Sequence, residues 1–304
     1  MNVLRWGQAE YERGFAPVLP DGWEVAVAPL GDSAPIEEAD VLVVPSLQRV
    51  TAAHVARLVA PAGRCRLVLT TTSGFDHVDT GALTRAGLAC ARLPLARRDA
   101  VVETTLGMIL ALTRRFGVLD AAAAEARWAR KELPEIGARL LGTVGVVGAA
   151  GVIGARVASV LEALGAKVLR CDPRFADSVP LGHLLAASDV VTLHCALNDQ
   201  NARLIDVDAL RSVRPGTILV NTARGPLVDV EAASAALRDG QLGGLGLDVF
   251  PTEPARLELL RHPRAILTPH AAGWHPGLGA AIAEGVGHAV AALASGKNVP
   301  WTLT

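Results

Sequence analysis

Short apolar runs alternate with longer helical segments along this chain, and this alternation constrains its fold more than any other feature. Most of the runs are apolar at consecutive positions, as expected for parallel strands that helices cover on both faces. The expected strands are residues 41–44, 67–70, 143–147, 167–171, 190–195, 217–221, 244–250 and 265–268. The expected helices are residues 51–59, 99–114, 152–164, 230–238 and 277–295, with an exposed helix at 121–130. These repeated strand–helix units predict an α/β fold with a doubly wound parallel sheet.

Length and composition limit the class of protein. A chain of 304 residues is long enough for two domains of ordinary size, and the rhythm of strands and helices breaks near residues 93–98 and 274–277. The net charge of −1, without any basic block, argues against a nucleic-acid partner. No apolar run is long enough for a membrane span, and the charged N-terminal segment does not resemble a signal peptide.

The cysteines point to a reducing compartment. Cys65, Cys90, Cys171 and Cys195 are scattered without metal-ligand spacing, and each lies in or beside an apolar run. Reduced, buried thiols are the expected state of such residues. We therefore expect no metal site and a cytoplasmic protein.

The stretch GVVGAAGVIG (145–154) lies between an expected strand and an expected helix, with a glycine at every third position. It does not match G-x-G-x-x-G, but Ala149, Gly151 and Gly154 have that spacing, and Gly148 is then an extra residue that supplies the tight turn. At such a turn a pyrophosphate meets free N–H groups and the positive end of a helix dipole. The stretch favours a Rossmann-type dinucleotide site, although glycine-rich turns also occur without nucleotides.

Asp172 supports the nucleotide interpretation. It follows the next expected strand, eighteen residues after Gly154. An acidic residue at about this distance binds the ribose hydroxyls and favours NAD over NADP. Arg174, two residues further on, leaves NADP open as an alternative.

Three further strand ends carry polar residues that together suit carbonyl reduction. Arg224, Glu253 and His270 follow the expected strands in the last third of the chain. Singly, they are compatible with a surface ion pair, a loop carboxylate and a turn histidine. Together, the arginine is able to hold a substrate carboxylate with two hydrogen bonds, and the histidine to exchange a proton with the carbonyl oxygen. A carboxylate beside the histidine stabilises its imidazolium form.

The segments TARGPLVD (222–229), GLDVFPTEP (246–254) and TPHAAGW (268–274) resemble the D-isomer-specific 2-hydroxyacid dehydrogenases. The resemblance extends from residue 73 to residue 274, about two thirds of the chain. It implies that Arg224, Glu253 and His270 are catalytic and that Asp248 faces the nicotinamide carboxamide. It also implies that Ser73 and Gly74 offer backbone N–H groups to the substrate carboxylate, which Arg224 binds as well.

The same resemblance implies NAD as the cofactor and defines two domains. A dinucleotide-binding domain is expected at 98–275, and residues 1–97 with 276–304 are expected to form a second, flavodoxin-like α/β domain that binds substrate, with the cleft between the two. Family members are usually dimers through the nucleotide domains. The side chain of His194 is interpreted as structural, although its loop belongs to the cofactor site. The implied cofactor-binding residues are Gly148, Ala149, Gly151, Val152, Ile153, Gly154, Asp172, His194, Thr222, Ala223 and Asp248.

The predicted function is NAD(H)-dependent interconversion of a small 2-oxo acid and its D-2-hydroxy acid, of the glyoxylate or hydroxypyruvate type. Two departures from the family pattern bear on it: Ala149 stands at a glycine position and Ala196 at a usual proline. Arg97 and Arg98 favour a substrate with a second anionic group, unless both are solvated hinge residues. One alternative is therefore a phosphohydroxyacid dehydrogenase of the 3-phosphoglycerate or erythronate 4-phosphate type. Another is a non-enzymatic, NADH-sensing binding protein.

Overall fold

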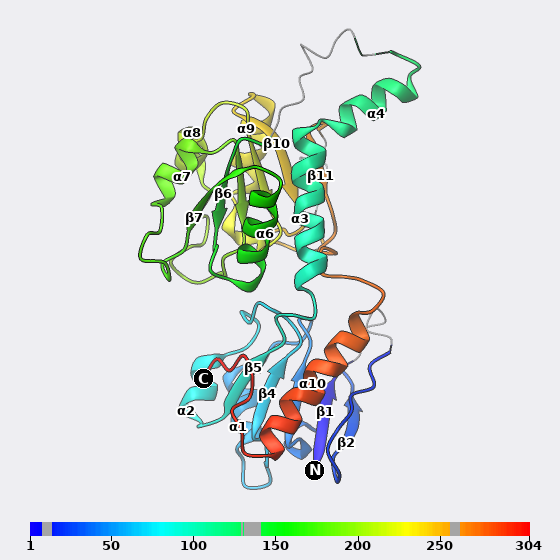
Figure 1. Cartoon of the computed structure of the whole chain (residues 1–304). Coiled ribbons are helices and arrows are strands. Elements are labelled where there is room, and N and C mark those ends of the chain that lie inside the picture. Colours follow the sequence, from blue (N-terminus) through cyan, green and yellow to red (C-terminus); the bar gives the residue numbers. More distant parts are fainter. Residues whose placement is uncertain (8–13, 129, 131–140, 256–261) are drawn as a thin grey trace. The chain divides into compact units, whose positions relative to one another are not determined.

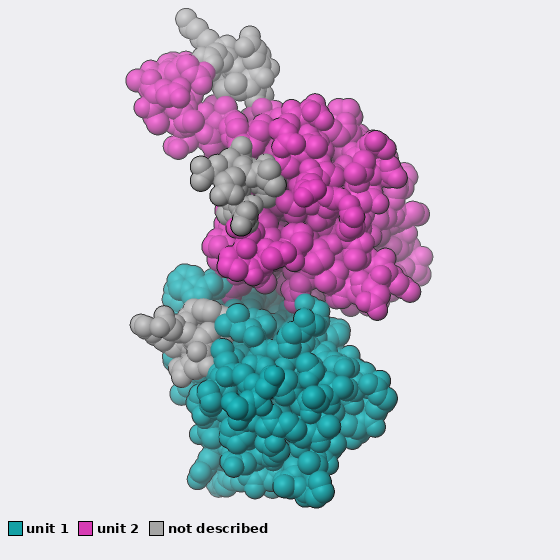
Figure 2. Space-filling model, turned by 180° about the vertical axis from the view of Figure 1, so that it is seen from behind, with its two compact units in different colours: residues 1–98, 274–304 teal, residues 99–273 magenta. Residues whose placement is uncertain are grey.

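The computed structural model describes residues 1–7, 14–128, 130, 141–255 and 262–304. The chain forms two compact units, which Figure 2 colours separately. Unit 1 contains Met1–Arg98 and Trp274–Thr304, and unit 2 contains Asp99–Gly273. Each unit has a parallel sheet and its own hydrophobic core.

Unit 1 is built on a five-stranded parallel sheet with the strand order β2-β1-β3-β4-β5. This is the flavodoxin-like order, so the expected flavodoxin-like α/β fold is confirmed. The strands are β1 (Asn2–Trp6), β2 (Glu24–Ala28), β3 (Val41–Val44), β4 (Leu67–Thr70) and β5 (Ala89–Arg92).

Helices cover both faces of the unit 1 sheet. Residues of α1 (Ala52–Leu58) and α2 (Thr80–Arg85) pack on one face. The long helix α10 (Leu278–Ala294), drawn in orange and red in Figure 1, packs on the other. Fully buried side chains recur at every fourth position of α10, at 278, 282, 286 and 290, which is the spacing of one helix face. Helix α10 thus completes a hydrophobic core whose other residues come mostly from the first hundred positions of the chain.

Unit 2 is built on a six-stranded parallel sheet with the strand order β11-β10-β9-β8-β6-β7. The chain runs outward from β6 in one direction to β7 and in the other direction from β8 to β11, as expected for a doubly wound sheet. The strands are β6 (Thr143–Val147), β7 (Lys167–Cys171), β8 (Val190–Leu193), β9 (Thr217–Asn221), β10 (Leu242–Leu247) and β11 (Ala265–Leu267).

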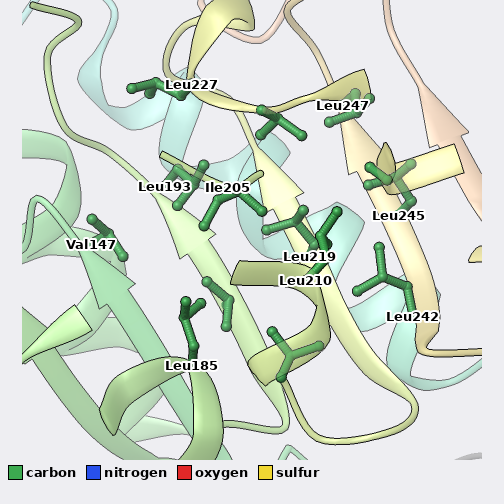
Figure 3. Packing of buried hydrophobic residues seen from close by; sticks show 14 of the residues in the cluster. Val147, Leu185, Leu193, Ile205, Leu210, Leu219, Leu227, Leu242, Leu245 and Leu247 are labelled. Carbon is green, nitrogen blue, oxygen red and sulfur yellow. The ribbon is translucent and has the colours of Figure 1, made fainter. Parts of the chain in front are cut away.

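The unit 2 sheet is also covered on both faces. Helices α3 (Arg98–Thr113) and α6 (Val152–Ala163) pack on one face, as Figure 1 shows. Helices α7 (Leu181–Ala187), α8 (Val207–Ser212) and α9 (Val230–Arg238) pack on the other, over the leucine-rich cluster of Figure 3. Because both faces are buried, the strands are apolar at consecutive positions, which is the pattern seen in the sequence.

The prediction of a helix at 121–130 is partly wrong. Helix α4 spans Phe116–Ala124 and shares only its last four residues with that range. It ends because Ala126 has a φ of 56° and the Arg127 N–H donates to the Ala122 carbonyl, which closes the last turn. Residue 129 of the expected helix lies outside the described residues.

The four cysteines are free thiols. Burial raises the pKa of Cys65, Cys90 and Cys195 to about 11, which favours the protonated thiol at neutral pH. Across the described ranges, no cluster of three or more His, Cys, Asp or Glu residues is suited to hold a metal ion. Within the same ranges, no helix combines the length and the hydropathy that a bilayer crossing requires.

Candidate active site

Most of the sequence-predicted polar residues of unit 2 lie at the carboxyl ends of its strands. All six strands are parallel, so these ends share one edge of the sheet. The strand order reverses between β6 and β8, and ligands of open α/β sheets bind at such a point. The glycine-rich turn follows β6 at this position.

The glycines of this turn are required by close packing. Gly148 has a φ of +81°, and a Cβ there would lie 2.4 Å from the Cys195 nitrogen. A Cβ on Gly154 would lie 2.4 Å from the Gly148 carbonyl oxygen, so the first turn of α6 sits directly on the loop. The extra residue therefore forms the tight turn, while Gly154 allows the close approach of helix and loop.

Helix α6 begins after Gly151, which is its N-cap. The N–H groups in the first turn of a helix have no partners within the helix, and here they belong to Val152, Ile153 and Gly154. Together with the positive end of the helix dipole they form an anion site of the kind that binds pyrophosphate. The turn thus fits a dinucleotide in spite of its irregular spacing.

Asp172 follows β7 and its side chain is buried. Its Oδ2 accepts a hydrogen bond from the Ala150 N–H (3.0 Å), which joins the end of β7 to the glycine turn. Arg174 donates to both carboxylate oxygens, from Nε at 2.9 Å and from Nη2 at 2.8 Å. The hydrogen bonds from the Arg174 guanidinium lower the pKa of Asp172 to about 2. Asp172 is therefore an anion at the carboxyl end of β7, already paired with a cation.

His270 and Glu253 form the central pair of the site. His270 Nδ1 lies 2.7 Å from Glu253 Oε2, although the two residues are 17 positions apart. Glu253 Oε1 accepts from the Phe250 N–H at 3.0 Å, so both carboxylate oxygens are engaged. This geometry sets Nδ1 as the protonated nitrogen and leaves Nε2 to act on a substrate. Both side chains are partly exposed, 49% and 37% respectively, so a ligand is able to reach them.

Asp248 holds the backbone that carries His270. Its carboxylate accepts hydrogen bonds from the Thr268 hydroxyl (2.6 Å) and from the N–H groups of Ala271 (2.8 Å) and Ala272 (3.0 Å). The Asp248 carbonyl accepts from the His270 N–H at 2.7 Å. The backbone of His270 has a φ of 54°, which lies in the left-handed region. Residues other than glycine adopt this conformation at an energetic cost. The Asp248 contacts hold this unfavourable conformation in place.

Arg224 lies in the loop after β9, and the side chain of Asn221 stabilises this loop by two hydrogen bonds. Asn221 Nδ2 donates to the Arg224 carbonyl (2.8 Å), and its Oδ1 accepts from the Ala223 N–H (3.0 Å). The neighbouring Thr222 hydroxyl hydrogen-bonds the hydroxyl of Thr105 on α3 at 2.8 Å. These contacts fix the backbone of the three predicted site residues 222–224.

Gly225 brings the Arg224 loop against the Glu253 loop. A Cβ on Gly225 would lie 1.9 Å from the carbonyl carbon of Phe250, so no other residue fits without movement of the backbone. Phe250 is also the residue whose N–H binds Glu253. Gly225 and Asn221 were not among the predicted site residues. The available signal was their place in the sequence, since Gly225 lies inside the segment 222–229 and Asn221 directly precedes it.

The other predicted site residues are His194 and three residues of unit 1. His194 Nε2 lies 3.0 Å from the Thr192 hydroxyl, and its Nδ1 has no hydrogen-bond partner within the part of the chain that the structure describes. Burial lowers the pKa of His194, consistent with a neutral, structural side chain. Ser73, Gly74 and Arg97 belong to unit 1 and not to the unit that carries Arg224, Glu253 and His270.

The comparisons with known proteins agree with this architecture. Residues 106–272 match the model of the D-isomer specific 2-hydroxyacid dehydrogenase, NAD binding domain. The D-3-phosphoglycerate dehydrogenase of Mycobacterium tuberculosis is 35% identical over 262 residues, which cover 83% of this chain and 47% of that protein. The chain thus spans about half the length of this relative.

Two further relatives match over most of their length. The hydroxypyruvate reductase of Thermotoga maritima is 32% identical over 260 residues, covering 82% of this chain and 80% of that protein. The crystal structure of D-lactate dehydrogenase from Aquifex aeolicus, complexed with NAD and lactic acid, is 27% identical with a TM-score of 0.82, over 97% of this chain and 96% of that one. The chain belongs to the D-isomer specific 2-hydroxyacid dehydrogenase family, and unit 2 is its NAD-binding domain.

Proposed function

We propose that this protein is an NAD(H)-dependent dehydrogenase that interconverts a small 2-oxo acid and its D-2-hydroxy acid. The observation that carries the proposal is the 2.7 Å contact between His270 Nδ1 and Glu253 Oε2, in a unit whose glycine turn fits a dinucleotide. The nicotinamide supplies or accepts the hydride. Residues of the protein bind the acid and donate or accept the proton.

In this proposal His270 Nε2 gives a proton to the substrate oxygen during reduction and takes it back during oxidation. Glu253 stabilises the imidazolium form and keeps the ring in its orientation. Arg224 binds the substrate carboxylate through its guanidinium. Asp248 positions His270 through the backbone and, as the family resemblance implies, lies on the nicotinamide side.

The cofactor-binding residues divide by the part of the dinucleotide that they serve. The N–H groups at the start of α6 bind the pyrophosphate, with Gly151 permitting the close approach. Asp172 binds the adenosine ribose. Gly148 and Ala149 form the turn that leads to these N–H groups. The residues assigned to the nicotinamide half are Thr222, Ala223 and Asp248 together with the loop of His194.

Ser73 and Gly74 bind the substrate carboxylate through backbone N–H groups. Both residues follow β4 in unit 1. Throughout the described residues, neither of these N–H groups donates a hydrogen bond to the protein. Unpaired N–H groups in a loop are the donors that an anionic ligand requires.

A phosphohydroxyacid is the second candidate substrate. It is favoured by the similarity to D-3-phosphoglycerate dehydrogenase and by Arg97 and Arg98, two adjacent cations that follow β5. In that case Arg97 would bind the phosphate group.

The experiment measures oxidation of NADH and NADPH with glyoxylate, hydroxypyruvate, pyruvate, phenylpyruvate and 3-phosphohydroxypyruvate, with Arg97→Ala and His270→Ala alongside. The proposal expects turnover of a plain 2-oxo acid with NADH, unaffected in Arg97→Ala and lost in His270→Ala. Turnover of only the phosphorylated acid, lost in Arg97→Ala, would establish the second candidate. Tight NADH binding without any turnover would point to an NADH-sensing protein instead.

We also propose that the protein is a cytoplasmic homodimer that associates through unit 2. The dimer rests on the family resemblance, and the compartment on the free thiols. Light scattering coupled to gel filtration tests the dimer, and a monomeric mass would overturn it.

A further inference from the structure

The side chains of the loop Thr72–Gly74 of unit 1 are engaged in hydrogen bonds to backbone carbonyls. The Thr72 hydroxyl donates to the Gly74 carbonyl at 2.7 Å, and the Ser73 hydroxyl donates to the Pro94 carbonyl at 3.2 Å. Neither the Ser73 N–H nor the Gly74 N–H, described above, takes part in these contacts. The hydroxyl groups of Thr72 and Ser73 therefore stabilise the conformation of the loop, and its backbone N–H groups are the donors for a ligand.

Arg92 also contacts this loop. It is the last residue of β5, and its Nη1 donates to the Ser73 carbonyl at 2.7 Å. Its guanidinium also lies over the Phe75 ring, 5.8 Å from the ring centre. The side chain thus reaches from β5 to the loop after the neighbouring strand β4 and contacts it on both sides of Gly74.

The Ser73 carbonyl and the Gly74 N–H belong to one peptide group. This group is planar, and in its trans form the carbonyl and the N–H point in opposite directions. A guanidinium bonded to the Ser73 carbonyl therefore fixes the direction of the Gly74 N–H, which points away from Arg92. A charged donor also polarises the peptide and strengthens the hydrogen bond that its N–H makes.

We propose that Arg92 is a positioning residue for substrate recognition, which acts on the substrate carboxylate through the Ser73–Gly74 peptide. This inference rests on the proposed function, in which Gly74 binds that carboxylate. Arg92 itself does not touch the substrate in this arrangement, because the peptide lies between them. Both the orientation of the donor and its strength depend on the guanidinium.

The test compares Arg92→Met, Arg92→Gln and Arg92→Lys with the wild type. Oxamate, a carboxylate analogue of a 2-oxo acid, and oxamide, its neutral counterpart, are titrated into the NADH-loaded protein by calorimetry. Kd for NADH alone is measured as well, together with kcat and KM for the best 2-oxo acid. Arg49→Met, at an exposed arginine of the same unit, is the matched control.

We expect Arg92→Met to raise Kd for oxamate and KM for the acid at least tenfold, with kcat changed less than KM and with Kd for NADH unchanged. Binding of oxamide should change far less, because the neutral analogue does not depend on a charge-assisted donor. Arg92→Lys should recover most of the affinity. Arg92→Gln keeps a donor without its charge and should lose most of it; this variant also serves if Arg92→Met does not fold.

Equal weakening of oxamate and oxamide, or an unchanged Kd for oxamate in the Met and Gln variants, would overturn the inference and leave Arg92 as a structural tie between strands. A wild type that turns over no 2-oxo acid would instead overturn the proposed function. The two failures are therefore distinct.

Discussion

Gly225 lies directly against the backbone of Phe250, so that a Cβ on Gly225 would fall 1.9 Å from the Phe250 carbonyl carbon. This contact joins the loop of Arg224 to the loop of Glu253. The Gly225→Ala change must push the two loops apart, and overpacking of this kind costs about 1–3 kcal/mol of unfolding free energy. We expect lower stability in urea unfolding together with a lower kcat.

Gly107 provides the matched control for this change. It lies in the middle of α3, and its Cβ position has no neighbour within 4 Å. Gly107→Ala should therefore be neutral or stabilise the protein by roughly 0.5–1 kcal/mol, because alanine is the better helix former. Equal effects of the two substitutions would contradict the packing argument.

Glu253→Gln removes the charge beside His270 and retains the shape of the side chain. The amide oxygen is still able to accept from the Phe250 N–H, so the loop should keep its conformation. We expect kcat for 2-oxo acid reduction to fall by roughly a hundredfold, because the imidazolium loses its stabilising anion, while Kd for NADH stays constant. Glu125→Gln, at a glutamate with a 70% exposed side chain, is the control. Wild-type kcat in Glu253→Gln would argue against the pair as the acid–base unit.

Asp172 should make stability depend on pH in the acid range. Its pKa is about 2 in the folded protein against an ordinary value of 3.8, so its contribution is present above about pH 4 and is lost as the pH falls toward 2. The full contribution is about 2 kcal/mol. The difference in unfolding free energy between the wild type and Asp172→Asn should shrink between pH 6 and pH 3. A constant difference for Asp172→Asn would show that its ion pair with Arg174 adds no stability.

Helix α10 should contribute to unit 1 through its buried face. Val286 is fully buried in α10, whereas Val27 on β2 is 56% exposed, so the same substitution is tested in two environments. Val286→Ala should cost about 2 kcal/mol and Val27→Ala less than about 0.5 kcal/mol. Unfolding followed by circular dichroism provides the measurement. Similar costs at the two positions would show that α10 does not pack as described.

Several strands of both units were readable from the sequence, because helices cover both faces of each sheet and these strands are therefore apolar at consecutive positions. The ranges expected for β3, β4, β6, β7 and β9 agree with the structure residue for residue. Three strands of unit 1 were missed. β2 is an edge strand with exposed residues and no clear apolar run, β1 has Arg5 within its short run, and β5 contains two alanines and no β-branched residue. The short helices α7 and α8 were missed because one or two turns carry too little periodicity to be recognised.

Local pattern by itself determined the α/β class, the strand-to-helix turn at 145–154 and the residue types that carry the proposed chemistry, since each of these depends on neighbours within a few positions. Tertiary structure alone decided the contacts between distant loops. The His270–Glu253 pair, the approach of Gly225 to Phe250 and the bond from Arg92 to Ser73 join residues 17 or more positions apart. Such contacts arise only when the sheet brings strand ends to one edge, and no single segment of the chain contains the information for that register.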